Sequence, residues 1–129
     1  MKESILVVDD NPANATLLTF LLEEEGYDAL AVADAQQALA RLESFDPVLI
    51  LMDIQLPGMD GLELTRRLKA DERWRNVLIV ALTAYAMKGD EERARAAGCD
   101  AYISKPIDTR TLPARIAELL EVRRRTASS

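Results

Sequence analysis

The segment ILVVDDNP at residues 5–12 decides the fold, because it places a short apolar run directly before two acids and a helix start. Its four apolar residues, 5–8, are typical of a strand that is covered on both faces, as in a parallel sheet. Asn11 followed by Pro12 is typical of a helix N-terminus, with a capping residue before a proline at the first helical position. The segment therefore predicts a strand, an acidic loop and a helix, in that order.

The same unit of strand and helix recurs along the chain. Strands are expected at residues 5–8, 29–32, 48–52, 77–82 and 101–103. Helices are expected at about residues 12–25, 35–43, 61–69, 88–97 and 109–123, although Pro113 suggests that the last one begins later than residue 109. Strict alternation predicts an α/β fold: a flavodoxin-like, doubly wound, five-stranded parallel sheet of order 2-1-3-4-5 with five helices.

Side-chain spacing predicts which residues pack in the core. The first helix is expected to bury one stripe that turns polar at its end, formed by Ala13, Leu17, Phe20, Leu21 and Glu24 at helical spacing. Trp74 and Cys99 are also interpreted as packing residues.

Composition excludes several classes of protein. The chain has 129 residues, 49% of them hydrophobic and 29% charged, which is typical of one globular domain. No apolar run reaches the roughly 20 residues of a membrane helix, and the N-terminus does not lead into a signal peptide, so we expect a cytoplasmic location without membrane contact. The single cysteine fits a reducing compartment. A net charge of −6 argues against direct DNA binding.

Polar side chains of complementary chemistry follow four of the predicted strands. In the expected strand order, the strand ends that meet at one edge of the sheet carry Asp9, Asp10, Asp53, Thr83 and Lys105. Three carboxylates placed so closely repel one another. A hard divalent cation such as Mg²⁺ relieves that repulsion, because it prefers oxygen ligands.

This combination predicts a site for phosphoryl transfer. Such a reaction depends mainly on positioning and on neutralising negative charge. Asp53 is the candidate carboxylate nucleophile, with Lys105 as a positive charge and Thr83 as a hydroxyl donor. The chain contains no histidine, so any phosphohistidine donor must belong to another protein.

Four motifs together resemble the receiver domain of two-component response regulators, of the chemotaxis-regulator-like, stand-alone type. They are LVVDDN at residues 6–11, LMDIQLPGMDG at 51–61, ALTA at 81–84 and SKP at 104–106. Each motif alone is a weak signal, whereas four in order at matching strand ends are specific. The resemblance covers about residues 3–120. We expect a receiver domain at residues 1–122, with no output domain after it, and a basic tail at 123–129 whose last four residues fray.

The resemblance implies a phosphoacceptor and a metal site. Asp53 would take a phosphoryl group from the phosphohistidine of a histidine kinase or a histidine phosphotransfer protein. Mg²⁺, with Mn²⁺ as a plausible substitute, would be held by Asp9, Asp10, Asp53 and the main-chain carbonyl of Gln55. The chain would thus be a signalling switch in a phosphorelay rather than an enzyme acting on a separate substrate, although it would catalyse phosphoryl transfer to, and hydrolysis from, its own Asp53.

The resemblance also implies how the switch works. Thr83 and Lys105 would contact the phosphoryl group, and Tyr102 would change rotamer. The surface formed by the fourth helix, the fifth strand and the fifth helix would then bind a downstream protein that the sequence does not identify. Gln55 and Tyr85 occupy positions that tune the phosphoryl lifetime, in a direction that the sequence leaves open.

Each of these residues also has an ordinary structural explanation. Asp9 and Asp10 are typical of turns before a helix, and Asp53 is typical of a turn before a Pro-Gly pair. Thr83 is equally suited to a cap, and Tyr102 to a half-buried strand position. Only their combination with Lys105 favours a functional site.

Two other classes of protein share part of the pattern. A nucleotide- or flavin-binding domain needs a glycine-rich first loop, whereas residues 9–12 are acidic. A haloacid-dehalogenase-type phosphatase needs a second acid two residues after its nucleophile, where Gln55 stands. Among receivers, the alternative is a module excised from a hybrid histidine kinase or a larger regulator. Residues 83–90 resemble free-standing and hybrid-kinase receivers more than those joined to DNA-binding domains.

Overall fold

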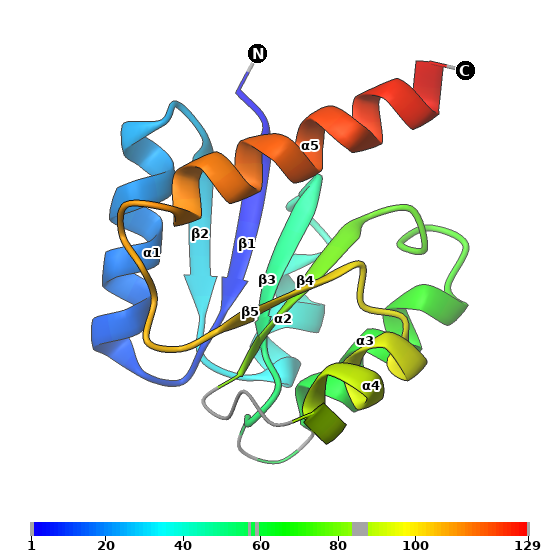
Figure 1. Ribbon diagram of the computed structural model, residues 1–129. Helices are drawn as coiled ribbons and strands as arrows, with labels where there is room; N and C mark the ends of the chain where they lie inside the picture. The colour runs from blue at the N-terminus through cyan, green and yellow to red at the C-terminus, as the bar shows by residue number, and fades with distance from the viewer. Residues whose placement is uncertain (1, 57, 59, 84–87, 129) are drawn as a thin grey trace.

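The computed structural model describes residues 2–56, 58, 60–83 and 88–128, in which strands and helices alternate (Figure 1). The strands are β1 (Ser4–Val8), β2 (Asp28–Val32), β3 (Leu49–Asp53), β4 (Leu78–Thr83) and β5 (Ala101–Ser104). The helices are α1 (Pro12–Glu24), α2 (Ala35–Arg41), α3 (Gly61–Ala70), α4 (Lys88–Ala97) and α5 (Leu112–Ser128). The strands pair in parallel in the order β2-β1-β3-β4-β5, which confirms the predicted fold class.

Helices cover both faces of the sheet, which explains why its strands are continuously apolar. On one face, α1 and α5 pack on a cluster that includes Ile5, Val7, Leu18, Leu51 and Ile116. On the other face, α2 and α3 pack on a cluster that includes Leu6, Val8, Ala38, Ile50 and Leu64. Helix α4 lies beside α3 and packs its alanines against Ala81 of β4. Polar groups of the central strands can therefore emerge only at the strand ends.

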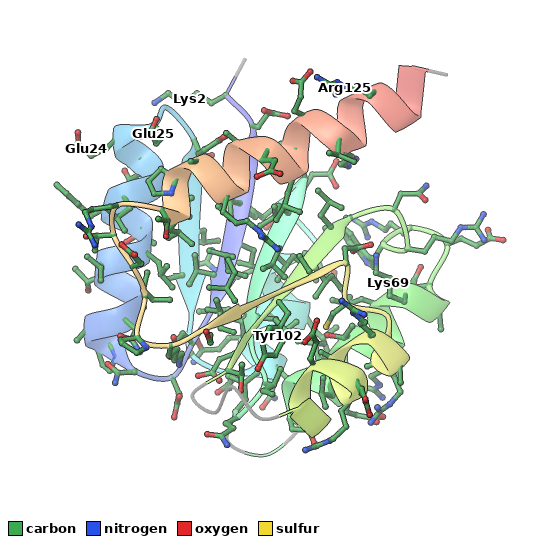
Figure 2. The ribbon with its side chains drawn as sticks, in the orientation of Figure 1. Lys2, Glu24, Glu25, Lys69, Tyr102 and Arg125 are labelled. Carbon is green, nitrogen blue, oxygen red and sulfur yellow. The ribbon has the colours of Figure 1, made fainter. Side chains whose placement is uncertain are left out.

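The buried face of α1 differs from the prediction. Leu18 and Leu22 are buried, whereas Phe20 is 58% exposed and Ala13 is exposed as well. The sequence TLLTFLL contains two overlapping apolar stripes, and helical period alone does not show which one meets the sheet. The expected stripe is therefore wrong at Ala13 and Phe20, whereas Leu17 is half-buried and Leu21 packs against the core cluster beneath α1. The last turn of α1 is polar as expected, with Glu24 and Glu25 on its outer end (Figure 2).

Helix α5 begins later and continues further than expected. It starts at Leu112, so that Pro113 falls in its first turn, where a missing N–H costs nothing. It then runs to Ser128, and Figure 1 shows its last turns extending past the sheet. Residues 126–128 are therefore helical, and the expectation that the last four residues fray stays a prediction. An ion pair between Arg125 Nε and Glu121 Oε1 at 3.4 Å, one turn apart, supports this end of the helix.

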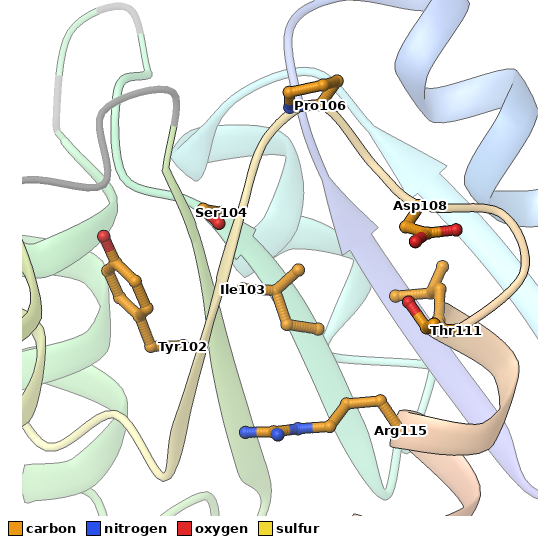
Figure 3. A pocket seen from close by; sticks show the side chains of 8 residues that line it. Tyr102, Ile103, Ser104, Pro106, Asp108, Thr111 and Arg115 are labelled. Carbon is orange, nitrogen blue, oxygen red and sulfur yellow. The ribbon is translucent and has the colours of Figure 1, made fainter.

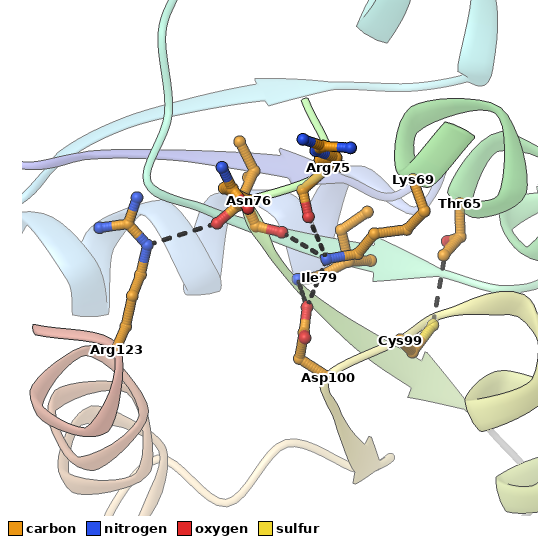
Figure 4. Close-up of polar contacts among 9 residues, drawn as sticks. Thr65, Lys69, Arg75, Asn76, Ile79, Cys99, Asp100 and Arg123 are labelled. Carbon is orange, nitrogen blue, oxygen red and sulfur yellow. Dashed lines mark hydrogen bonds and ion pairs between the residues drawn. The ribbon is translucent and has the colours of Figure 1, made fainter. Parts of the chain in front are cut away.

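Lys69 joins three segments at the amino ends of β4 and β5 (Figure 4). Its ammonium donates hydrogen bonds to the carbonyl of Arg75 at 3.1 Å, the carbonyl of Val77 at 2.8 Å and Asp100 Oδ2 at 2.9 Å. Asp100 Oδ2 also accepts a hydrogen bond from the backbone N–H of Ile79 at 2.9 Å. The end of α3 and the starts of β4 and β5 are thereby held together, at the end of the sheet opposite the acidic loops.

Trp74 and Cys99 are packing residues, as predicted. Trp74 is 6% exposed and lies in the loop that precedes β4. Cys99 is half-buried, and its Sγ lies 3.8 Å from Thr65 Oγ1. No helix among the described residues has the length and apolar character needed to cross a membrane.

Candidate functional site

The register of the parallel strands brings four polar strand ends to one edge of the sheet. Val8 at the end of β1 pairs with Met52 of β3, so Asp9 and Asp53 follow at the same level. Asp53 pairs with Leu82 of β4, and Thr83 pairs with Ser104 of β5. Lys105 comes directly after β5, and its backbone N–H donates to the carbonyl of Thr83 at 2.6 Å. The residues predicted from the sequence for this edge are therefore neighbours in space.

Three carboxylates form a compact cluster at this edge. Asp9, Asp10 and Asp53 each place a carboxylate oxygen within 4.8 Å of the others. Asp9 and Asp53 are 2% and 4% exposed, whereas Asp10 is exposed. Asp9 Oδ1 accepts a hydrogen bond from the N–H of Asn11, and Asp53 Oδ1 accepts one from the N–H of Gln55, both at 2.9 Å. Each buried acid thus holds the loop after its strand with one oxygen and keeps the other for a different contact.

Lys105 contacts both buried acids. Its Nζ donates to Asp53 Oδ2 at 2.9 Å and lies 3.3 Å from Asp9 Oδ2, with 16% of the side chain exposed. Burial alone would lower the pKa of Lys105, but the hydrogen bond and charge of Asp53, together with Asp9, outweigh burial and raise it. Lys105 therefore carries a full positive charge against two acids that come from other strands.

The protein neighbours of Asp9 compensate only part of the cost of burying its negative charge. Burial raises the pKa of Asp9, and the nearby charge of Asp53 adds to the rise, although the Asn11 N–H and Lys105 oppose it. Its Oδ2 forms an ion pair with the Lys105 ammonium at 3.3 Å but accepts no hydrogen bond from the described part of the chain. A buried carboxylate oxygen without a hydrogen bond is costly. The donor set, three carboxylates with one oxygen unsatisfied, fits a hard divalent cation such as Mg²⁺.

The remaining predicted residues lie around this cluster or outside the described chain. Thr83 is fully buried at the end of β4, and the Gln55 side chain is exposed beside Asp53. Tyr102 is half-buried on β5 and packs against the cluster that contains the alanines of α4 (Figure 2). Tyr85 is outside the described residues.

Gly61 is a positioning residue that the sequence analysis missed. It is the first residue of α3, where its N–H donates to the carbonyl of Ile54 at 3.2 Å. A Cβ atom at this position would lie 2.8 Å from Ile54 Cα and even closer to the Asp53 carbonyl. Helix α3 therefore approaches the end of β3 as closely as a residue without a side chain permits. A glycine at a helix start, directly after a capping aspartate, is the signal that pointed to this contact.

Replacing Gly61 by alanine is expected to destabilise the fold and displace Asp53. The new methyl group meets backbone rather than a flexible side chain, so we expect a loss of about 1–3 kcal/mol in the free energy of unfolding. Urea denaturation measures it. Gly89→Ala in α4 is the matched control, because its methyl group meets nothing within 4 Å and stability should not fall. Equal stability of the two variants would show that the close approach is not limiting.

Replacing Asp9 by asparagine is expected to stabilise the chain when no divalent cation is present. The raised pKa of Asp9 means that its ionised form is less favourable in the folded chain than in the unfolded one, so this acid costs stability at pH values above its folded pKa. The neutral amide should raise the free energy of unfolding at pH 7 by roughly 1 kcal/mol.

Thermal unfolding followed by circular dichroism, with and without Mg²⁺, tests this expectation. Mg²⁺ should raise the melting temperature of the wild type and raise that of Asp9→Asn by much less. Asp46→Asn, in an exposed loop, is the control and should respond to Mg²⁺ like the wild type. An equal Mg²⁺ response in all three proteins would remove Asp9 from the metal site.

Residues 5–117 match the response regulator receiver domain family. The polar-differentiation response regulator DivK of Brucella ovis is 50% identical over 107 residues, which cover 83% of this chain and 87% of that protein. A CheY-like response regulator receiver domain protein from Methanospirillum hungatei JF-1 superposes with a TM-score of 0.89 at 33% identity, covering 98% of this chain and 99% of the other.

One solved structure bears directly on the acidic cluster. The receiver domain of a sensor histidine kinase from Pseudomonas aeruginosa PAO1, with a magnesium ion coordinated in its active site cleft, has a TM-score of 0.79 and 39% identity, with both chains fully covered. The curated relative at 50% identity is a response regulator, so an origin in a hybrid kinase is not favoured. The family match, the identity and the shared topology agree, and the chain belongs to the response regulator receiver domain family.

Proposed function

We propose that this receiver accepts a phosphoryl group on Asp53 from a phosphohistidine of a partner kinase or histidine phosphotransfer protein. The observation that carries this proposal is the placement of Asp53, which is 4% exposed and contacts the Lys105 ammonium at 2.9 Å beside a second buried acid, Asp9. An acid used only as a turn residue would not require a buried cation from another strand. Residues 1–122 form the receiver unit in this proposal.

The chemistry follows from these positions. A carboxylate oxygen of Asp53 attacks the phosphorus atom while the bond from phosphorus to the partner's imidazole nitrogen breaks, and that nitrogen keeps the electron pair. Lys105 places positive charge beside the carboxylate, where it also stabilises the negative phosphoryl oxygens. Thr83, at the end of the neighbouring strand, supplies a hydroxyl to one of those oxygens. Hydrolysis is the same displacement with water as nucleophile, which returns Asp53 and inorganic phosphate.

Asp9, Asp10, Asp53 and the main-chain carbonyl of Gln55 would hold Mg²⁺, with Mn²⁺ as a substitute. The bound ion supplies positive charge that offsets the three acids and the phosphoryl oxygens. The unsatisfied Oδ2 of Asp9 and the spacing of the three carboxylates support this assignment. Access of water to the phosphoryl group would be controlled by Gln55 and Tyr85. Gln55 lies in the loop after Asp53, and its side chain is exposed.

Phosphorylation would change the surface formed by α4, β5 and α5. Lys105 and Thr83 are linked by a backbone hydrogen bond, so a phosphoryl group that draws both side chains acts on β5. Tyr102 lies on β5, three residues before Lys105, and would change rotamer. The altered surface would bind a downstream protein in the cytoplasm, without direct contact to DNA.

Asp53→Asn is expected to abolish phosphoryl uptake. A carboxamide is a poor nucleophile, so intact-mass measurement after incubation with acetyl phosphate and Mg²⁺ should show one added phosphoryl group on the wild type and none on the variant. The added group should be stable in acid and lost to hydroxylamine, as an acyl phosphate is. Asp46→Asn, an exposed acid in the loop before β3, is the control and should take up the group normally. Normal uptake by Asp53→Asn would contradict the assignment.

Lys105→Ala is expected to preserve Mg²⁺ binding while impairing the switch. The ammonium contacts acids rather than supplying ligand atoms, so calorimetric Mg²⁺ affinity should not fall. Amide chemical shifts of β5 and α4 should change on addition of beryllofluoride in the wild type, and should change far less in the variant. Unchanged shifts in β5 of the wild type, or equal shifts in both proteins, would remove Lys105 from the switch.

A further inference from the structure

The outer surface of β5 is hollowed on both sides of Arg115. β5 is an edge strand of the sheet, and α4 and α5 flank it. A hollow of about 360 Å³ lies between the end of β5 and the start of α5, and a smaller one of about 180 Å³ lies between α4 and the middle of α5. Both are lined by Tyr102 and Arg115, and Figure 3 shows the larger one. This surface therefore offers two adjacent recesses that share one arginine and one aromatic ring.

The larger hollow suits an apolar side chain. Its walls include Ile103, which is half-buried, Leu112, which is 3% exposed, and the ring of Tyr102. Figure 3 shows Ile103 between Tyr102 and Thr111, with the Arg115 side chain below it, extending from α5 toward β5. At this volume, near the lower limit of about 300 Å³ for small-molecule pockets, it takes one or two side chains rather than a cofactor.

Arg115 is an unpaired cation among paired charges. The acids around the two hollows already have partners in the chain: Asp108 with Arg110 at 3.6 Å, Glu91 with Arg95 at 2.8 Å, and Asp100 with Lys69 at 2.9 Å. Arg115 is exposed, and its guanidinium makes no ion pair or hydrogen bond with any described residue. The Arg115 guanidinium, which lies between the two hollows, is thus available to a carboxylate. A guanidinium binds a carboxylate through two parallel hydrogen bonds.

We propose that this surface binds an acidic segment of a partner protein, with a carboxylate paired to Arg115 and a neighbouring apolar side chain seated in the larger hollow. The inference names the class of partner for the switching surface and rests on the proposed function. One cation in a chain of net charge −6 does not attract a polyanion such as DNA. The competing occupant is a second copy of this chain, which would offer Glu118, one turn further along α5 and also unpaired among the described residues.

Selection of short random peptides displayed on phage tests the inference on the intact chain, in the presence of Mg²⁺ and beryllofluoride. Enriched peptides should carry Asp or Glu beside a large apolar residue. Fluorescence polarisation with such a peptide should show affinity about tenfold lower for Arg115→Met than for the wild type, because a charge-assisted hydrogen bond is lost, and mostly retained for Arg115→Lys. Arg41→Met is the matched control, since Arg41 is exposed on α2 and lines a hollow beside β2, the opposite edge strand. It should bind like the wild type.

Three results would overturn the inference. The first is enrichment of peptides without acidic residues. The second is equal affinity for the wild type and Arg115→Met. The third is a dimer, detected by light scattering, that Arg115→Met abolishes, because a second copy would then be the occupant.

Phosphoryl uptake, measured by intact mass on the same proteins, separates this inference from the proposed function. If both the wild type and Arg115→Met take up the phosphoryl group, but peptide binding does not depend on Arg115, then only the proposed class of partner is overturned. Absence of uptake by the wild type overturns the proposed function itself.

Discussion

Three carboxylates meet at the carboxyl ends of β1 and β3, and the ammonium of Lys105, from the end of β5, contacts the two that are buried. The polar groups gather there because β1, β3 and β4 are covered by helices on both faces, which leaves only the strand ends for charged side chains. One oxygen of Asp9 has the Lys105 ammonium as an ion-pair partner but no hydrogen bond from any residue that the structure describes. We expect this buried negative charge to lower the free energy of unfolding of the isolated chain and to favour binding of a cation. Functional sites commonly have such a cost in stability.

The rest of the fold keeps this arrangement in register. Gly61 allows α3 to approach the end of β3, and Lys69 holds the beginnings of β4 and β5 through three hydrogen bonds. Because the amino ends of these strands are anchored, we expect any movement driven by charge at the carboxyl ends to be confined to a short part of β5 and its neighbours. A receiver needs this combination, in which most of the core stays fixed while one surface changes.

Much of the fold followed from the sequence, because continuous apolar runs and strict alternation permit few topologies. The sequence also predicted that Asp9, Asp53 and Lys105 lie close together, since strand order determines which strand ends meet. Local packing did not. The apolar residues of α1 form two stripes of equal quality, and only the tertiary structure shows that Phe20 lies outside. The contact of Gly61 with β3 and the length of α5 depend on how elements approach one another, which period and capping rules do not describe.

The position of Trp74 has a practical consequence. It is the only tryptophan, and it is buried in the loop before β4, whereas the acidic cluster lies beyond the other end of the sheet. Six strand residues at about 3.3 Å each separate the two by roughly 20 Å. Intrinsic emission of this indole should therefore follow global denaturation of the chain and stay nearly insensitive to cations bound at the acids. Tryptophan emission then reports the unfolding of the chain without interference from cation binding.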